Sequence, residues 1–213
     1  MKNHFIFGIG RCGTNGLTTD ISIQNPKCKL LNNYFLHVWK TDEANNDLNV
    51  HLKVDFENNI PEKLDALKRY NNPNGFVLTA TASTIDNHIF HFLNPVCDIY
   101  LIERDWLDCF LSHAILSTDQ KAQGRDEWKW HGPTIDIPNN SLTVSQDIFD
   151  MFTERYETYI KFKKQMTFKK VFKFEDYTFQ NEDFKSEYNL PKKIDYIRNK
   201  TEVMQFLANL LKN

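Results

Sequence analysis

Three glycines and an arginine near the start of the chain have the types and spacing of a phosphate-binding loop. Gly8, Gly10 and Gly13 surround Arg11 within the run Phe7–Gly16. Glycines let a phosphate approach the backbone N–H groups, and the N–H groups at the start of a helix attract an anion. The sequence therefore predicts an anion-binding pocket in this part of the chain.

A loop of this kind needs a strand before it and a helix after it. His4–Phe7 is a short apolar run that suits a buried parallel strand. Leu17, Ile21 and Ile23 give the following segment an apolar face compatible with a helix. We therefore expect a strand-loop-helix junction. A tight turn without a ligand would use the same glycines, and this structural alternative stays open.

Two other phosphate loops share part of the pattern. Gly8-x-Gly10-x-x-Gly13 matches the dinucleotide fingerprint, which also needs a carboxylate about 20 positions further on. The chain has Leu30–Tyr34 there, and the next carboxylates are Asp42 and Glu43, which disfavours a nicotinamide or flavin cofactor. A Walker loop needs Lys-Ser/Thr where this chain has Thr14-Asn15, so an ordinary ATPase or kinase is also disfavoured.

A second candidate site follows a later strand. Asp98–Glu103 is a strand-like run, Arg104 ends it, and Ser112 lies eight residues later on a predicted helix. A guanidinium offers a planar fork to a phosphate, and a hydroxyl about two helical turns further on adds a donor. The bland alternative is an arginine at a strand end and an exposed helical serine.

Together these two segments resemble the sulfotransferase family of the P-loop superfamily. Arg11–Asn15 resembles its Arg/Lys-Ser-Gly-Thr-Thr loop, and Arg104 with Ser112 resembles its 3′-phosphate segment. The resemblance implies 3′-phosphoadenosine 5′-phosphosulfate as co-substrate, with no metal. It assigns stabilisation of the leaving phosphate to Arg11 and the 3′-phosphate to Arg104 and Ser112. The 5′ group would be held by the loop residues Arg11, Cys12, Gly13, Thr14, Asn15 and Gly16.

The family pattern continues more weakly toward the carboxyl end. Val171–Tyr177 resembles the late strand that ends in a Tyr/Phe-Glu-Asp-Leu pattern. Arg198 and Lys200 fall roughly where many members bring a second basic residue to the 3′-phosphate. Their position and charge alone support this assignment.

The catalytic base is where the chain departs from the family. Cytosolic members place a Lys-x-His pair after the strand that corresponds to Gly75–Thr79, where this chain continues Thr79-Ala80-Thr81-Ala82. Other members have a Glu about 20 residues past the loop, where this chain has Asn32-Asn33-Tyr34. The candidate replacements are His37, Asp42 and Glu43.

Other histidines are interpreted as structural. His113 is adjacent to Ser112, and neighbouring positions on a helix point about 100° apart. His88 and His91 have a spacing that could bind a metal, but no carboxylate-and-histidine set accompanies them. A hydrolase triad would need a Gly-x-Ser-x-Gly elbow, which the sequence lacks.

Length, composition and cysteine content predict a single intracellular domain over residues 1–213. The chain has 213 residues, 41% of them hydrophobic, and a formal net charge of −2, so we expect no nucleic-acid partner. No apolar run approaches about 18 residues and no basic leader precedes the first strand, so we expect no signal peptide and no membrane anchor. The four cysteines lack disulfide or metal spacing, which predicts reduced thiols and a cytoplasmic protein.

Alternating strands and helices predict an α/β fold, a central parallel sheet flanked by helices of the P-loop sulfotransferase type. Residues 118–141 are predicted to form a surface loop or lid, in which Trp128, Trp130 and His131 would either stack on an acceptor or pin the segment to the core. The expected activity is sulfuryl transfer to a hydroxyl or amine of a carbohydrate or small metabolite. The alternatives are a non-catalytic nucleotide-binding protein and a P-loop phosphotransferase. The acceptor and the oligomeric state stay open.

Overall fold

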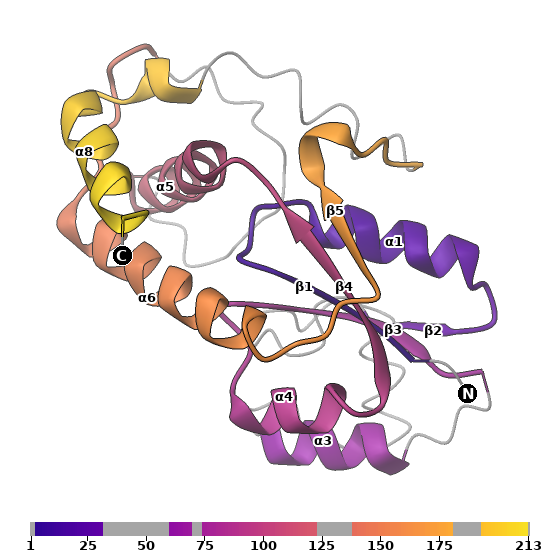
Figure 1. Ribbon diagram of the computed structural model, residues 1–213. Helices are drawn as coiled ribbons and strands as arrows, with labels where there is room; N and C mark the ends of the chain where they lie inside the picture. Colours follow the sequence, from indigo (N-terminus) through magenta and orange to yellow (C-terminus); the bar gives the residue numbers. More distant parts are fainter. Residues whose placement is uncertain (1–2, 32–59, 70–73, 123–137, 181–192, 213) are drawn as a thin grey trace.

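A parallel β-sheet forms the centre of the protein. The computed structural model describes residues 3–31, 60–69, 74–122, 138–180 and 193–212 (Figure 1). Within these residues five strands pair in the order β2-β3-β1-β4-β5, and every pairing is parallel. The strands are β1 (Asn3–Gly8), β2 (Lys29–Leu31), β3 (Phe76–Thr81), β4 (Cys97–Glu103) and β5 (Lys170–Lys173). The predicted α/β fold with a central parallel sheet is confirmed.

Helices lie on both faces of the sheet. Right-handed connections carry the chain from β1 toward β2 and from β3 toward β4 in opposite directions, which places their helices on opposite faces. Figure 1 shows α1 on one side and α3 and α4 on the other, with α5 and α8 beyond the end toward which β4 points. The bounds are α1 (Thr14–Gln24), α3 (Ile60–Arg69), α4 (Asn87–Leu93), α5 (Trp106–Ala122), α6 (Gln146–Lys163) and α8 (Lys200–Leu210).

β1 is the central strand of the sheet. Phe5 of β1 pairs with Leu78 of β3 on one side and with Ile99 of β4 on the other. All three side chains are buried, because a parallel strand covered by helices on both faces has no solvent side. The apolar run around His4–Phe7 therefore formed the predicted buried strand.

The carboxyl ends of β1, β3 and β4 meet at one edge of the sheet. In α/β sheets ligands bind at this edge, where the connections of neighbouring strands leave in opposite directions. The loop after β1, the turn after β3 and the start of α5 after β4 therefore lie together. Both sequence motifs fall at this edge.

Three local predictions differ from the structure. Leu17 and Ile21, one helical turn apart, are buried, but Ile23 is 53% exposed because two further residues turn it away from the sheet. Helix α5 continues to Ala122, so the first residues of the predicted lid are helical and 123–137 lie outside the described residues. The predicted strand Val171–Tyr177 ends at Lys173 and continues as a 3-10 turn, η1 (Phe174–Asp176).

A carboxylate at the end of β4 ties three elements together. Glu103 accepts hydrogen bonds from Tyr159 (3.0 Å) and Lys163 (2.5 Å) of α6 and from Lys173 (2.8 Å) of β5. Burial raises the pKa of Glu103, but the hydrogen bonds from the two lysines and Tyr159 outweigh it and bring the pKa to about 2. The carboxylate is therefore charged at neutral pH and fixes the strand end that leads into Arg104.

Candidate anion-binding site

The loop after β1 has a backbone that only small residues tolerate at key points. Gly10 and Gly13 have φ angles of 103° and 90°, and Arg11 between them has a φ of 57°. A Cβ atom on Gly8 would collide with the Cys12 sulfur, and it would lie 2.9 Å from the methyl carbon of Thr14. The chain therefore makes a tight left-handed turn here that brings backbone groups close together.

Helix α1 begins directly at this turn. The N–H group of Leu17 donates to the carbonyl of Gly13 over 3.0 Å, so the helix starts at Thr14. The N–H groups of the first helical turn, including those of Thr14, Asn15 and Gly16, have no acceptor within the helix. The helix dipole favours negative charge at this end. The geometry thus has the features that the sequence predicts for a phosphate loop.

Cys12 points under this loop, toward Gly8. Its side chain is fully buried, and burial raises the pKa of the thiol to about 11. Cys12 is therefore a neutral thiol at physiological pH. A neutral, buried thiol offers no charge to an anion.

Arg104 joins the second motif to the first. Its Nη1 atom donates to the carbonyl oxygen of Arg11 over 3.3 Å, and its Nη2 atom lies 3.1 Å from a carboxylate oxygen of Asp108. The side chain is only 8% exposed, and its guanidinium carbon lies 4.2 Å from the centre of the Phe174 ring. The strand-end arginine therefore lies beside the phosphate loop.

Phe174 also contacts the loop itself. A Cβ atom on Gly13 would lie 2.7 Å from the Phe174 ring and 3.0 Å from Phe179. The turn after β5 therefore packs on both motifs at once. Glu175 holds this turn in place by accepting a hydrogen bond of 2.8 Å from the N–H group of Asp105.

Ser112 has a basic neighbour that the sequence did not indicate. Lys193, at the start of the 3-10 turn η2 (Lys193–Tyr196), donates a hydrogen bond of 2.5 Å to the Ser112 hydroxyl. Burial, helped by the charges of Arg104 and Arg11 and opposed by that of Asp108, lowers the pKa of Lys193 to about 8. Lys193 therefore lies within electrostatic reach of both arginines. We call Arg11, Arg104 and Lys193 the cationic cluster.

The basic residues expected near this position point elsewhere. The Nε atom of Arg198 donates to the carbonyl of Asn140 over 3.3 Å, and Lys200 lies 3.7 Å from the carboxylate of Asp195. The structure thus brings Lys193, and neither of these two residues, to Ser112. No sequence motif distinguishes Lys193 from its basic neighbours, because its place depends on how η2 packs against α5.

His113 is a neutral, buried residue. It is 2% exposed, and the Nη1 atom of Arg155 in α6 lies 2.8 Å from its ring nitrogens. Burial, helped by the charges of Arg155 and Arg11, lowers the pKa of His113 to about 3. A base this weak takes up a proton poorly at neutral pH. The structural role expected from the sequence agrees with this environment.

Other candidate residues lie away from the cluster or outside the described ranges. His88 and His91 are exposed on α4, and across the described residues no group of three or more His, Cys, Asp or Glu could hold a metal ion. His37, Asp42 and Glu43 fall in 32–59, and Trp128, Trp130 and His131 fall in 123–137, so these candidates lie outside the described residues.

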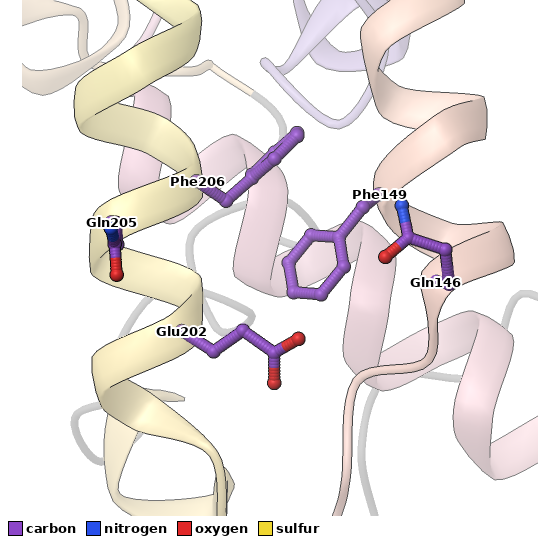
Figure 2. Close-up of a pocket in the computed structure, with 5 residues that line it drawn as sticks. All are labelled: Gln146, Phe149, Glu202, Gln205 and Phe206. Atoms are coloured by element: carbon purple, nitrogen blue, oxygen red, sulfur yellow. The ribbon is translucent and has the colours of Figure 1, made fainter.

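A pocket between α6 and α8 is separate from this site. Figure 2 shows the residues that line it, which are Gln146, Phe149, Glu202, Gln205 and Phe206. The rings of Phe149 and Phe206 lie 4.6 Å apart and belong to the packing of the two helices. None of the motif residues lines this pocket.

In the segments that the structure describes, no helix combines the length and apolarity needed to cross a bilayer. The chain matches no protein-family model and no curated protein.

Proposed function

We propose that this chain binds 3′-phosphoadenosine 5′-phosphosulfate and transfers its sulfuryl group to a hydroxyl or amine of a carbohydrate or small metabolite. One observation carries the proposal: the cationic cluster and Ser112 lie directly beside a glycine-rich loop at a helix start. Two adjoining anion sites suit a ligand with phosphate groups at both its 3′ and 5′ positions. The resemblance of both motifs to sulfotransferases supports the same ligand.

The charges of the cluster suit a phosphate monoester. Three cations are close together, and Arg104 pairs with Asp108 at 3.1 Å. Burial is the main cause of the lowered pKa of Lys193, and repulsion from the charges of Arg104 and Arg11 adds to it. A bound dianion would relieve this repulsion and accept the hydrogen bonds of the guanidinium, lysine and serine groups.

Sulfuryl transfer needs stabilisation of the leaving group. The S–O bond to the phosphate breaks as a new bond forms to the acceptor oxygen or nitrogen, the acceptor proton passes to a base, and the bisphosphate leaves. Arg11 would stabilise the negative charge on the leaving phosphate, and the N–H groups of Thr14 and Asn15 would orient it. This chemistry requires no metal.

The end of β3 argues against a triphosphate-dependent phosphotransferase. Nucleotide triphosphatases of the P-loop type bind Mg²⁺ with a carboxylate near the loop and with a loop Ser/Thr that follows a Lys. Here Thr81 ends β3 and pairs in register with Gly8 at the end of β1. Asn15 stands at the position of the loop Ser/Thr.

The same strand end favours a second candidate, a nucleotide-binding protein without transfer activity. The last residue of β3, Thr81, and the following Ser83 and Thr84 carry hydroxyl groups where cytosolic sulfotransferases have a histidine. His113 has too low a pKa to replace it. Under this candidate the ligand would be bound and not turned over.

Ligand selectivity tests the binding proposal. Thermal unfolding and calorimetry are compared with 3′-phosphoadenosine 5′-phosphate, AMP, ATP-Mg²⁺ and NAD. A ligand that binds the native state raises the melting temperature, and at equal concentration the tighter ligand raises it more. We expect the bisphosphate to stabilise most, with AMP as the matched control that lacks the 3′-phosphate. Equal or stronger stabilisation by NAD would reject the proposal.

Labelled co-substrate distinguishes the enzyme from the binding protein. The protein is incubated with ³⁵S-labelled 3′-phosphoadenosine 5′-phosphosulfate and a pool of glycans and metabolites. The incubation is then repeated with the variants His37→Ala and Glu43→Gln. A general base contributes ~10²–10⁴-fold, so loss of the true base should reduce product formation by that factor while bisphosphate affinity stays constant. Tight binding without labelled product favours the second candidate.

A further inference from the structure

A pair of hydroxyl groups lies at the end of β3, beside the phosphate loop. The Oγ1 atom of Thr81 and the Oγ atom of Ser83 are 2.8 Å apart in an exposed position. One hydroxyl donates its proton to the other, which leaves the second O–H group able to donate to a ligand. The pair is therefore a neutral polar group at the edge where the three strand ends meet.

The backbone holds this pair in a fixed turn. The N–H group of Thr81 donates to the hydroxyl of Thr84 over 2.9 Å, and the carbonyl of Thr81 accepts from the N–H groups of Thr84 and Ile85, each at 2.9 Å. Side-chain and backbone bonds of this kind make a compact turn whose geometry depends little on other segments. The two hydroxyls are thus pre-positioned.

This turn adjoins the phosphate loop on the side opposite the cationic cluster. Ala82 donates a hydrogen bond of 3.0 Å to the carbonyl of Gly8, and a Cβ atom on Gly10 would lie 3.9 Å from the Cβ atom of Thr81. Arg104 approaches the loop from β4, on the other side of β1. The loop therefore has cations on one side and hydroxyls on the other.

This asymmetry sets the direction in which a ligand lies. A nucleotide whose 3′-phosphate binds Arg104, Ser112 and Lys193, and whose 5′ group binds the loop with Arg11, extends its far end toward β3. In a phosphosulfate that far end is the sulfuryl group. Its oxygens carry negative charge and accept hydrogen bonds from neutral hydroxyl donors.

We propose that Thr81 and Ser83 bind the sulfuryl oxygens of the phosphosulfate and hold that group toward the acceptor. The assignment rests on the proposed function and adds the residues that distinguish the sulfated co-substrate from its desulfated product. Because the product lacks the sulfuryl group, it makes no contact with this pair. The two ligands should therefore respond differently to removal of the hydroxyls.

Calorimetric titration with both nucleotides tests the pair. Thr81→Val and Ser83→Ala each remove one hydroxyl of the pair, and Thr81→Ser keeps the hydroxyl at position 81. The control Thr167→Val removes a threonine hydroxyl at an exposed position before β5. We expect Thr81→Val and Ser83→Ala to weaken binding of the phosphosulfate about 10-fold or more, as for a hydrogen bond to a charged group. Their affinity for 3′-phosphoadenosine 5′-phosphate should stay within about 2-fold.

Three other results would overturn the assignment of Thr81 and Ser83 to the sulfuryl group. If both variants keep the wild-type ratio of the two affinities, the pair does not contact the sulfuryl group and the inference is wrong, while the proposed function stands. Equal weakening of both ligands would show that Thr81 only shapes the loop, and would also overturn it. If the wild-type protein binds neither nucleotide, the proposed function fails and the inference falls with it. Thr81→Ser should restore the wild-type ratio.

Discussion

Lys193 donates a hydrogen bond of 2.5 Å to Ser112 across 81 positions of sequence. The contact joins the 3-10 turn η2 to helix α5 and places a third cation beside Arg104 and Arg11. Ser112 alone would be an ordinary helical hydroxyl. With Lys193 it becomes part of a site whose charge depends on pH.

Binding of the 3′-phosphate should weaken as the pH rises through the pKa of Lys193. That pKa is lowered from 10.5 to about 8, so the lysine is charged at pH 7 and neutral well above pH 8. A dianion favours the charged form, so the dissociation constant should rise on the order of tenfold per pH unit above about 8, until the pKa of the bound state is reached. Calorimetry from pH 6.5 to 9.5 with 3′-phosphoadenosine 5′-phosphate measures this slope.

Two variants of Lys193 serve as controls for the pH experiment. Lys193→Arg keeps its charge throughout the range and should flatten the profile, and Lys193→Gln should bind weakly at every pH. If affinity falls as steeply with pH in Lys193→Gln as in the wild-type protein, the titration belongs to another group. The effect of this residue on stability runs in the opposite direction to its effect on binding. Between pH 8 and 10.5 the unfolded chain binds more protons at Lys193 than the folded chain does, so the contribution of Lys193 to the unfolding free energy rises with pH.

Arg104 should distinguish nucleotides with and without a 3′-phosphate. Arg104→Ala removes a charge-assisted contact of about 1.5–3 kcal/mol, so binding of the bisphosphate should weaken roughly 10- to 100-fold while AMP changes little. Arg104→Lys, which keeps the charge in a less disruptive change, should show an intermediate loss. Arg198→Ala is the matched control, because Arg198 bonds to the carbonyl of Asn140. Equal losses for both nucleotides would make Arg104 a structural residue.

Glu103 should be a main electrostatic contributor to stability. Glu103→Gln weakens the hydrogen bonds from Tyr159, Lys163 and Lys173 and should lower the unfolding free energy by about 1.5–3 kcal/mol. Because the folded pKa of about 2 lies below the ordinary 4.5, this stabilisation is complete above pH 4.5 and is lost as the pH falls toward 2. Urea unfolding at pH 7 and pH 3 measures both effects.

An exposed ion pair is the control for Glu103. Asp65 and Lys68 lie 2.9 Å apart on α3 with side chains 62% and 57% exposed, so Asp65→Asn should cost no more than about 0.5 kcal/mol. A cost for Glu103→Gln as small as this would mean that burial cancels the benefit of its hydrogen bonds.

Tyr177 should hold the segment after β5 against helix α1. Its hydroxyl donates to the carboxylate of Asp20 over 3.0 Å, and the N–H group of Gln180 donates to the same oxygen over 3.0 Å. Asp20 is fully buried, so Tyr177→Phe should destabilise the protein by about 1.5–3 kcal/mol. Tyr156→Phe, which removes the hydroxyl of a half-buried tyrosine on α6, should cost less than about 0.5 kcal/mol. If urea unfolding shows the same loss of stability for both variants, the hydrogen bond from Tyr177 to Asp20 contributes little.

The sequence indicated the parts of the site whose place is set locally. Apolar runs predicted β1 and β4, and glycine spacing predicted the turn between β1 and α1. Arg104 and Ser112 follow because a strand end and a helix fix their separation. These features depend on neighbouring residues, which is what sequence patterns record.

The parts that depend on tertiary packing could not be predicted. Alternating residues suggested a strand through Tyr177, but Phe174 leaves the sheet to pack on Arg104 and Gly13, and Glu175 bonds to Asp105. Lys193 lies in a polar stretch with no pattern of its own. Its contact with Ser112 arises only when η2 packs on α5, an arrangement that no local propensity encodes.

The position of β1 between two later strands has a consequence for folding. Asn3 pairs with Cys97 and Phe7 with Leu101, so the first strand of the chain gains its β4 neighbour only after about a hundred residues have been made. Closing such non-local pairs is slow compared with forming local helices. The phosphate loop meets Arg104 only in that step, and Lys193 joins later still, so a chain emerging from the ribosome cannot assemble the site before β4 docks. The rate at which nucleotide binding recovers during refolding therefore reports how fast β4 pairs with β1.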